Sequence, residues 1–340
     1  MSEDNQQTPK PQVQPHDKPL LTISEQIAHL KSKGVTFDLC DEAEATAFLT
    51  KNNYLRTASY RMLYEQRVDG DRAGTYINLD FGDLIALSRI DRRLRETLLL
   101  AAADVEHFAK VRLLNRAEIE NEDGYAIILT FYESLNHSER SRIQGTLKMR
   151  SSTGERHDNY TGDLIAHYGV ERLPLWAVVE VMEFGHLLTL YKYCAERWND
   201  RRMLQEHYVL KSVKALRNAT AHGSCIANGF TKKAEYAGYE VNALVAKSMS
   251  EEGMPNTKTR RSKMKNLRIA QIAATLWAIR EFCPEDTCQR RHALRFAELK
   301  SFIAETGLLE RANDGIVSFF DFLNKLVDIW IPQQSQYIWT

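Results

Sequence analysis

The sequence of 340 residues lacks a net charge and a long apolar run, and its first residues do not resemble a signal peptide. Its 45 Lys and Arg residues balance its 45 Asp and Glu residues, so attraction to a polyanion must come from a local cluster of cations. No apolar run approaches the roughly 18 residues that span a bilayer. The polar start, residues 1–17, lacks the basic and apolar regions of a signal peptide. We therefore expect a cytoplasmic protein without a membrane partner.

Cysteine is also scarce, and no two cysteines form a CxxC pair. The two that lie closest in sequence, Cys283 and Cys288, have no second pair nearby that would complete a zinc site. No carboxylate and histidine cluster has metal-ligand spacing either. We expect reduced thiols, no metal site and no cofactor.

Helical periodicity dominates the rest of the chain. From Phe81 to Ile119, apolar residues recur in steps of three and four, and no proline or glycine follows Gly82. This pattern predicts one helix on the order of 50 Å long. Strand patterns are weak throughout. The sequence therefore predicts an all-α fold, a helical bundle with an N-terminal helical extension.

The composition divides the chain into three expected parts. Residues 1–19 are rich in Gln, Pro, Asp and Asn and are expected to form a disordered tail. Residues 20–78 are expected to be the helical extension, in which capping boxes begin at Thr22 and Asp41. Residues 79–335 are expected to form the main helical domain, with a basic loop near 256–268. The Arg-rich stretch 91–96 is interpreted as a solvated face with internal ion pairs.

One segment carries residues suited to phosphodiester chemistry: Arg217-Asn218-Ala219-Thr220-Ala221-His222. A guanidinium can hold a phosphate through two parallel hydrogen bonds, and an imidazole can exchange a proton near neutrality. RNA supplies its own nucleophile, the 2′-hydroxyl. Arg217 and His222 therefore indicate metal-independent RNA cleavage. The alternative is that His222 is a capping or core histidine and Arg217 a salt-bridge residue.

An ordered set of segments accompanies this hexapeptide. The segments are Lys18-Pro19-Leu20-Leu21-Thr22 with Gln26 and Leu30, residues 54–60, Phe81-Gly82-Asp83-Leu84-Ile85 ahead of Asp91-Arg92-Arg93-Leu94, Glu106, and Leu173-Pro174-Leu175-Trp176 with Glu180, Phe184 and Gly185. Together with Arg217-Asn218-x-x-Ala221-His222 they resemble the Abi family of prokaryotic abortive-infection proteins, the AbiD/AbiF-like branch of the HEPN superfamily. The resemblance covers most of the chain after residue 18.

The resemblance implies a HEPN-like helical bundle that acts as a metal-independent endoribonuclease. The Arg and His of the family fall on Arg217 and His222, with Asn218 as the polar residue between them. Two protomers usually join their sites, so a homodimer is implied. Some relatives are toxins that act during phage infection and are restrained by a protein antitoxin or a small non-coding RNA. Gly223 departs from the family pattern, where a second His or a bulky residue is common, so the resemblance does not fix substrate preference.

Helix geometry and chemistry assign roles to these residues. Five helical steps separate Arg217 from His222 by about 140° in projection, so one protomer encloses a phosphate poorly and two would share a cleft. His222 would remove the 2′-hydroxyl proton, Arg217 would stabilise the phosphorane, and the second protomer's His222 would protonate the leaving oxygen. Asn218 would orient the phosphate or His222. Glu106 and Glu180 are supporting candidates that would orient Arg217 or His222, or else are ordinary helix-face carboxylates.

A cluster of cations near residue 260 is the candidate surface for the RNA backbone. It comprises Lys258, Arg260, Arg261, Lys263, Lys265 and Arg268. Its alternative is a solvated loop. Two other functions stay open for the whole chain: a non-catalytic RNA-binding or regulatory HEPN protein, and a helical adaptor that binds another protein.

Overall fold

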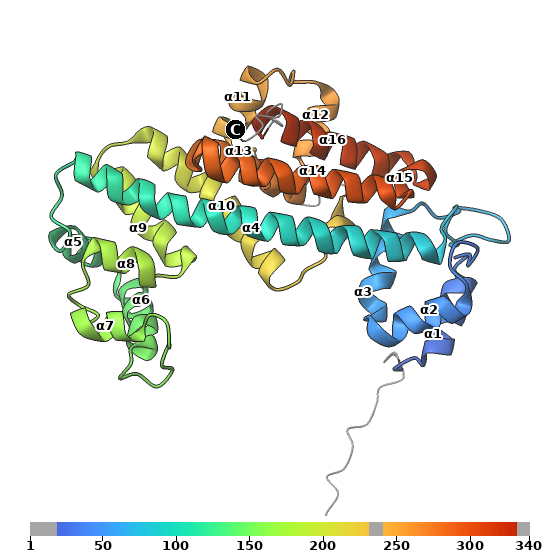
Figure 1. Ribbon diagram of the computed structural model, residues 1–340, viewed down its shortest axis with the longest axis horizontal. Coiled ribbons are helices and arrows are strands. Elements are labelled where there is room, and N and C mark those ends of the chain that lie inside the picture. Colours follow the sequence, from blue (N-terminus) through green and yellow to red (C-terminus); the bar gives the residue numbers. More distant parts are fainter. Residues whose placement is uncertain (1–18, 231–240, 332–340) are drawn as a thin grey trace, which may run out of the picture. The chain divides into compact units, whose positions relative to one another are not determined.

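The protein is helical throughout the part of the chain that the computed structural model describes, residues 19–230 and 241–331 (Figure 1). No strand occurs in these ranges, in which two isolated bridges pair Thr36 with Asp80 and Gln66 with Tyr76. The predicted all-α fold is confirmed. The predicted disordered tail falls almost wholly outside the described residues. None of the described helices combines the length and the hydropathy that crossing a membrane requires.

The chain divides into two compact units, residues 1–84 and 85–340, so the division falls in the first turn of the long helix. In the first unit the helices are α1 (Ile23–Ser32), α2 (Glu42–Lys51), α3 (Tyr54–Ser59) and the 3-10 helix η1 (Tyr60–Leu63). Both predicted capping boxes are present, at Thr22 and at Asp41. Each cap accepts the backbone N–H three residues on, and the Glu at that position bonds back to the cap.

The second unit contains the long helix and all later helices. They are α4 (Phe81–Ile119, which starts in the first unit), α5 (Ala126–Ser134), α6 (His137–Arg150), α7 (Gly162–Tyr168), α8 (Leu175–Val181), α9 (Phe184–Arg197), α10 (Arg201–Ala221), η2 (Ala227–Gly229), α11 (Ala243–Glu251), α12 (Lys258–Met264), α13 (Leu267–Phe282), the π-helical turn η3 (Glu285–Gln289), α14 (Arg290–Glu305), α15 (Leu308–Arg311) and α16 (Asp314–Trp330). The bounds of α4 are those that the periodicity predicts.

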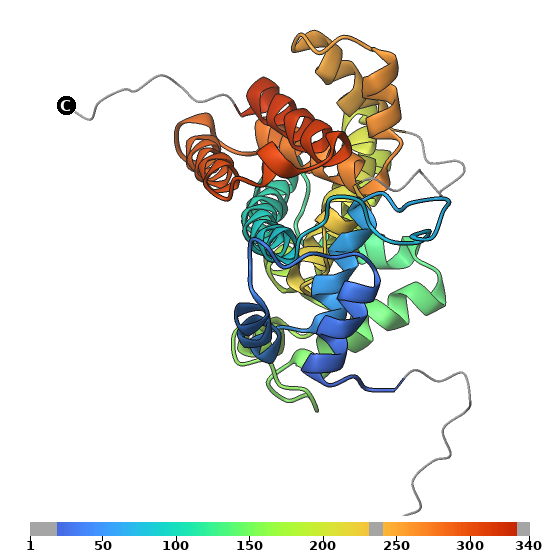
Figure 2. The same cartoon turned by 90° about the vertical axis from the view of Figure 1, so that its right-hand side faces the viewer.

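Helix α13 occupies the centre of the second unit. It packs against α10 and α16, and α10 also packs against α9. Figure 2, which looks nearly along α4, shows α14 and α16 side by side in this bundle. Nearly every residue of α13 from Ile269 to Ile279 is buried. A helix that is apolar on all sides is suited to this central position.

The expected basic loop near 256–268 is wrong, because most of this segment is helical. Thr257 accepts the backbone N–H of Arg260 and so caps α12. Asn266 accepts the N–H groups of Arg268 and Ile269 and caps α13. Two N-caps nine residues apart therefore convert a polar, basic stretch into a short helix and the start of a long one.

The expected solvated face at residues 91–96 is also wrong in part. Asp91 is completely buried, whereas Arg92 and Glu96 form an exposed ion pair. The Asp91 carboxylate accepts the backbone N–H groups of Ile226 and Ala227, each at 2.7 Å, and its other oxygen lies 2.7 Å from the Arg95 guanidinium. Asp91 thus fastens the segment after α10 to α4.

Candidate functional site

Helices α4 and α10 and the junction between α8 and α9 surround a polar cavity of about 480 Å³. Its charged and polar lining residues are Glu106, Lys110, Arg150, Glu180, Glu183, Lys214, Arg217 and Asn218. The remaining wall is formed by Val181, Met182, Phe184 and Gly185. The structure therefore brings together four of the residues predicted for the site, namely Arg217, Asn218, Glu106 and Glu180.

Arg217 is held by weak contacts and stays accessible. Its Nε lies 3.5 Å from the Glu106 carboxylate, and its Nη1 donates to Asn218 Oδ1 at 3.3 Å. The Arg217 side chain is 40% exposed and that of Glu106 only 15%. Burial raises the pKa of Glu106, while the positive charges of Arg217 and Lys110 act in the opposite direction. Glu106 thus contacts the Arg217 guanidinium at a longer distance than in a close ion pair.

Arg150 forms a rigid part of the cavity wall. Its Nη2 and Nε donate to Asp158 at 2.6 and 3.2 Å, and its Nη1 donates to the Val181 carbonyl at 2.8 Å. The hydrogen bond from Arg150 holds the pKa of Asp158 far below its usual range, helped by the Tyr160 N–H and the Thr161 hydroxyl. Arg150 therefore fixes the end of α8 against the end of α6, and α8 contributes Glu180 to the cavity.

Several residues near the cavity were missed by sequence reasoning. Lys110 lies one turn beyond Glu106, and Lys214 lies one turn before Arg217, so helical spacing could have found both. Arg150 comes from a different helix, and no local pattern indicates it. His186, next to the cavity residue Gly185, is a further imidazole in this region. Burial lowers its pKa, Glu183 opposes this shift, and the cations Arg142 and Lys214 reinforce it.

His222 does not line the cavity. It is the exposed C-cap of α10, and its backbone N–H donates to the Asn218 carbonyl at 2.9 Å. Ser224 N–H donates to the Ala219 carbonyl and Gly223 N–H to that of Thr220, the paired contacts of a Schellman motif. Gly223 has a φ of 69°, the left-handed region that favours glycine. This turn explains Gly223 and excludes a core role for His222.

Arg260 and Arg268 are engaged by the protein itself, which corrects their assignment to an RNA-binding surface. Arg260 is buried and donates to the Ser250 hydroxyl at 2.9 Å and to the carbonyls of Met254, at 2.6 Å, and Ala246. Arg268 donates to the carbonyls of residues 225 and 226 and to the side chain of residue 228. Both guanidiniums therefore fasten chain segments and are not free to hold a phosphate.

The other four cations of this segment differ in exposure. Lys258, Arg261 and Lys265 are exposed, and Arg261 donates to the Asn256 carbonyl at 2.7 Å. Lys263 is half-buried, and burial lowers its pKa, with Asp321 opposing the shift. This segment is not among the cavity-lining residues.

A second cluster of chemically active side chains lies on another face of α4. Asp104, Cys288 and His292 place one ligand-type atom each within 4.8 Å of the others. Sequence spacing could have indicated Cys288 and His292, which are four residues apart, but not Asp104, which is 184 residues from Cys288. The sequence prediction of no metal site considered Cys283 and Cys288 as a pair and left His292 out.

Comparison with known proteins gives one match. A family model described as Abi-like protein matches residues 47–228. No curated protein and no solved structure matches the chain. The matched range covers more than half of the sequence and contains Glu106, Glu180, Arg217 and His222, whereas the basic segment 256–268 lies beyond it. The chain belongs to the Abi-like protein family.

Proposed function

We propose that this protein is a metal-independent endoribonuclease of the HEPN type that acts as an abortive-infection toxin against phage. Membership of the Abi-like family supports the role in defence. The observation that carries the enzymatic proposal is the polar cavity in which Arg217 and Asn218 lie beside Glu106. An accessible guanidinium, oriented by a carboxylate that is mostly buried, suits the binding of a phosphate.

The charges of the cavity favour a single phosphodiester over a long duplex. Lys110, Arg150, Lys214 and Arg217 supply four cations, against three carboxylates. Since Arg150 is already bonded to Asp158, we assign the contact with the scissile phosphate to Arg217 and a supporting role to Lys110 and Lys214. The exposed cations Lys258, Arg261 and Lys265 are the remaining candidates for contacts with other phosphates of a bound RNA.

The proposed reaction uses the sugar's own oxygen. Neutral His222 accepts the proton of the 2′-hydroxyl, whose oxygen forms a bond to phosphorus. Arg217 stabilises the negative charge of the phosphorane, and Asn218 orients the phosphate. The bond from phosphorus to the 5′-oxygen breaks, and the leaving oxygen takes a proton from the second protomer's His222. The products are a 2′,3′-cyclic phosphate and a 5′-hydroxyl.

The position of His222 supports a composite site in a homodimer. His222 is exposed at the end of α10, outside the cavity that contains Arg217. One chain therefore does not enclose a phosphate between its own Arg217 and His222, and two copies that pair at the ends of α10 would bring both histidines to a shared cleft beside Arg217. A protein antitoxin or a small non-coding RNA that covers this surface would restrain the cytoplasmic toxin.

The same observation favours a second candidate function. If no partner brings an imidazole to Arg217, the cavity binds RNA phosphate without breaking it, and the protein is a non-catalytic RNA-binding regulator. The two candidates differ in product chemistry, because only the enzyme generates cyclic phosphate ends.

The test compares RNA cleavage and host-growth arrest by the full chain and by Arg217→Ala and His222→Ala variants. Exposed residues outside the cavity, Arg290 and His137, supply the matched controls R290A and H137A. In buffer with EDTA we expect the site variants to lose about 10²-fold or more of the cleavage rate, with both controls unchanged. Unchanged cleavage in both site variants refutes the site, and wild-type protein that binds RNA but leaves it intact supports the regulator.

A further inference from the structure

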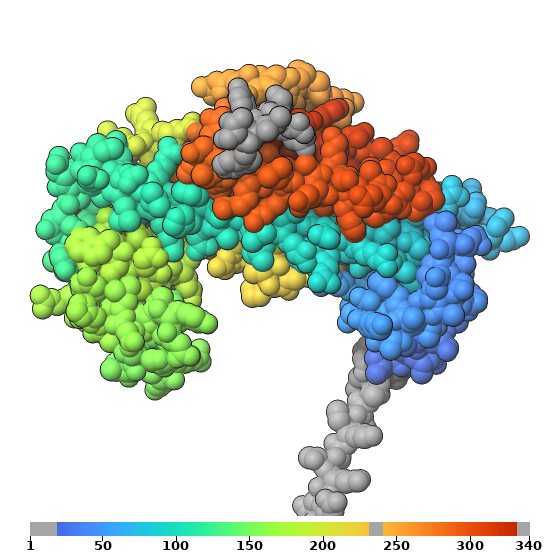
Figure 3. Space-filling model, viewed as in Figure 1, coloured from blue at the N-terminus to red at the C-terminus, as the bar shows by residue number. Residues whose placement is uncertain are grey.

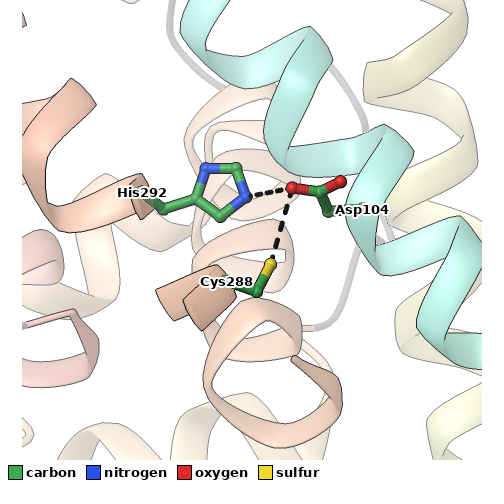
Figure 4. A group of neighbouring side chains, drawn as sticks. All are labelled: Asp104, Cys288 and His292. Atoms are coloured by element: carbon green, nitrogen blue, oxygen red, sulfur yellow. Dashed lines mark hydrogen bonds and ion pairs between the residues drawn. The ribbon is translucent and has the colours of Figure 1, made fainter. Parts of the chain in front are cut away.

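In Figure 4, the side chains of Cys288 and His292 converge on one carboxylate oxygen of Asp104, and the three residues come from separate elements. Asp104 lies in the middle of α4, Cys288 in the π-helical turn η3, and His292 in the first turn of α14. Asp104 Oδ2 is 2.9 Å from His292 Nε2 and 3.5 Å from Cys288 Sγ. Cys288 and His292 are buried, and Asp104 is partly buried.

A fourth ligand-type group lies beside this cluster. Cys283 is the buried C-cap of α13, and its thiol lies near enough to that of Cys288 to interact with it, although it is not one of the three ligand-type atoms within 4.8 Å of one another. The two cysteines and the histidine have the spacing Cys-x₄-Cys-x₃-His, which is within the range of structural zinc sites. Asp104 completes the set from a distant part of the sequence.

We propose that Asp104, Cys283, Cys288 and His292 bind one Zn²⁺ ion. Thiolate, imidazole and carboxylate together are a ligand set that suits zinc and suits Mg²⁺ or Ca²⁺ poorly. Tetrahedral zinc with ordinary bond lengths separates sulfur from oxygen by ~3.5 Å and nitrogen from oxygen by ~3.3 Å. The observed separations of 3.5 and 2.9 Å are close to these values for Asp104, Cys288 and His292, and the Cys283 side chain would move toward the ion as the fourth ligand.

Arg291 also contacts the carboxylate and is compatible with the ion. Its Nη2 lies 2.9 Å from Asp104 Oδ2, but its side chain is 52% exposed. When zinc takes Oδ2, the guanidinium can move to Oδ1, since carboxylates that bind metals are commonly hydrogen-bonded in this way.

The ion would have a structural role, distinct from RNA cleavage. Four protein ligands leave no open position for a substrate. Zinc would join the end of α13, the turn η3 and the start of α14 to α4, along the face that Figure 3 shows α14 covering. Asp104 and Glu106 are two residues apart and hence about 200° apart around α4, so the zinc site and the polar cavity occupy opposite sides of that helix.

The test uses the full-length chain purified under reducing conditions. We expect one Zn²⁺ per chain by elemental analysis, a higher unfolding midpoint with Zn²⁺ than after chelation, and thiolate-to-metal charge-transfer absorption on Co²⁺ substitution. Loss of a hydrogen-bonding partner of a metal ligand typically weakens metal binding by roughly 10–100-fold. Cys288→Ser and Cys283→Ser each remove a ligand itself, so each should weaken zinc binding by more than this. The partly exposed Cys225 supplies the control C225S, which should bind zinc like the wild type.

Three results would overturn the proposal. The first is a wild-type chain that takes up neither Zn²⁺ nor Co²⁺ at micromolar concentration. The second is a Co²⁺ spectrum without a thiolate band, and the third is a stable disulfide between Cys283 and Cys288 in reduced preparations. The first two measurements need no variant, so they remain decisive if a cysteine substitution prevents folding.

Discussion

Removal of the Asp91 carboxylate should destabilise the second unit more than any substitution of the surrounding arginines. Asp91 is fully buried, and its carboxylate accepts hydrogen bonds of 2.7 Å from two backbone N–H groups and from Arg95. These contacts join Asp91 in α4 to Ile226 and Ala227, which lie 135 and 136 positions later in the sequence. Asp91→Ala leaves all three donors without this acceptor, in a region that water does not reach easily.

The structure allows the cost to be worked out in two steps. Removal of one member of a buried ion pair costs about 3–5 kcal/mol, because its partner keeps an uncompensated charge. Arg95 is 15% exposed, so it regains part of its hydration, and we expect Asp91→Ala to lie near the lower end of this range. Both backbone N–H groups bond the same oxygen, Oδ1. Asp91→Asn retains such an acceptor and should cost only about 1–2 kcal/mol.

Urea unfolding followed by far-ultraviolet circular dichroism measures these differences. The matched control is Glu96→Ala, which removes an exposed carboxylate from the same helix and its ion pair with Arg92. We expect the control to change the free energy of unfolding by about 0–0.5 kcal/mol. The reasoning fails if Asp91→Ala is no less stable than Glu96→Ala, or if Asp91→Asn is as damaging as Asp91→Ala.

Three further predictions test other parts of the fold. Burial lowers the pKa of His207 to about 4, so the folded state prefers its neutral form. The free energy of unfolding should therefore fall as the pH drops from 6.5 toward 4. His207→Gln should make the urea midpoint depend less on pH over this range. An added Cβ at Gly154 would meet the Lys148 carbonyl at 2.2 Å, whereas at Gly145 it meets nothing within 4 Å. Gly154→Ala should therefore lower the free energy of unfolding by about 1–3 kcal/mol, and Gly145→Ala should raise it. Equal changes in the free energy of unfolding for the two variants would contradict this reasoning. Arg260→Ala should cost about 1–3 kcal/mol in the same assay, and a neutral result would mean that its three contacts are dispensable.

The helices could be predicted wherever the signal is local. The pattern of apolar residues gives both ends of α4, and the residue types at Thr22 and Asp41 give two helix starts. These signals depend on residues three or four apart. The same local reasoning failed at residues 256–268, because a high density of cations was read as a solvated loop although Thr257 and Asn266 are N-caps.

Buried charges were the main failure of sequence reasoning, and the cause is physical. Most acceptors of Arg260 and Arg268 are backbone carbonyls, which every residue carries, so no residue type marks them. Asp91 likewise bonds backbone N–H groups far along the chain. A charged side chain whose partner is the backbone looks in sequence like one that faces water, and only the tertiary structure distinguishes the two.

The candidate site was predicted in part for a related reason. Arg217 and Asn218 share a helical turn, and Glu106 and Glu180 line the same cavity. The angle of about 140° between Arg217 and His222 on one helix requires that the two side chains diverge, and the structure has His222 outside the cavity. Helix geometry thus limits what one chain can do, and the ribonuclease proposal depends on a second copy to supply the imidazole. In this proposal the cavity would bind the phosphate, and the pairing of two chains would supply the proton transfer.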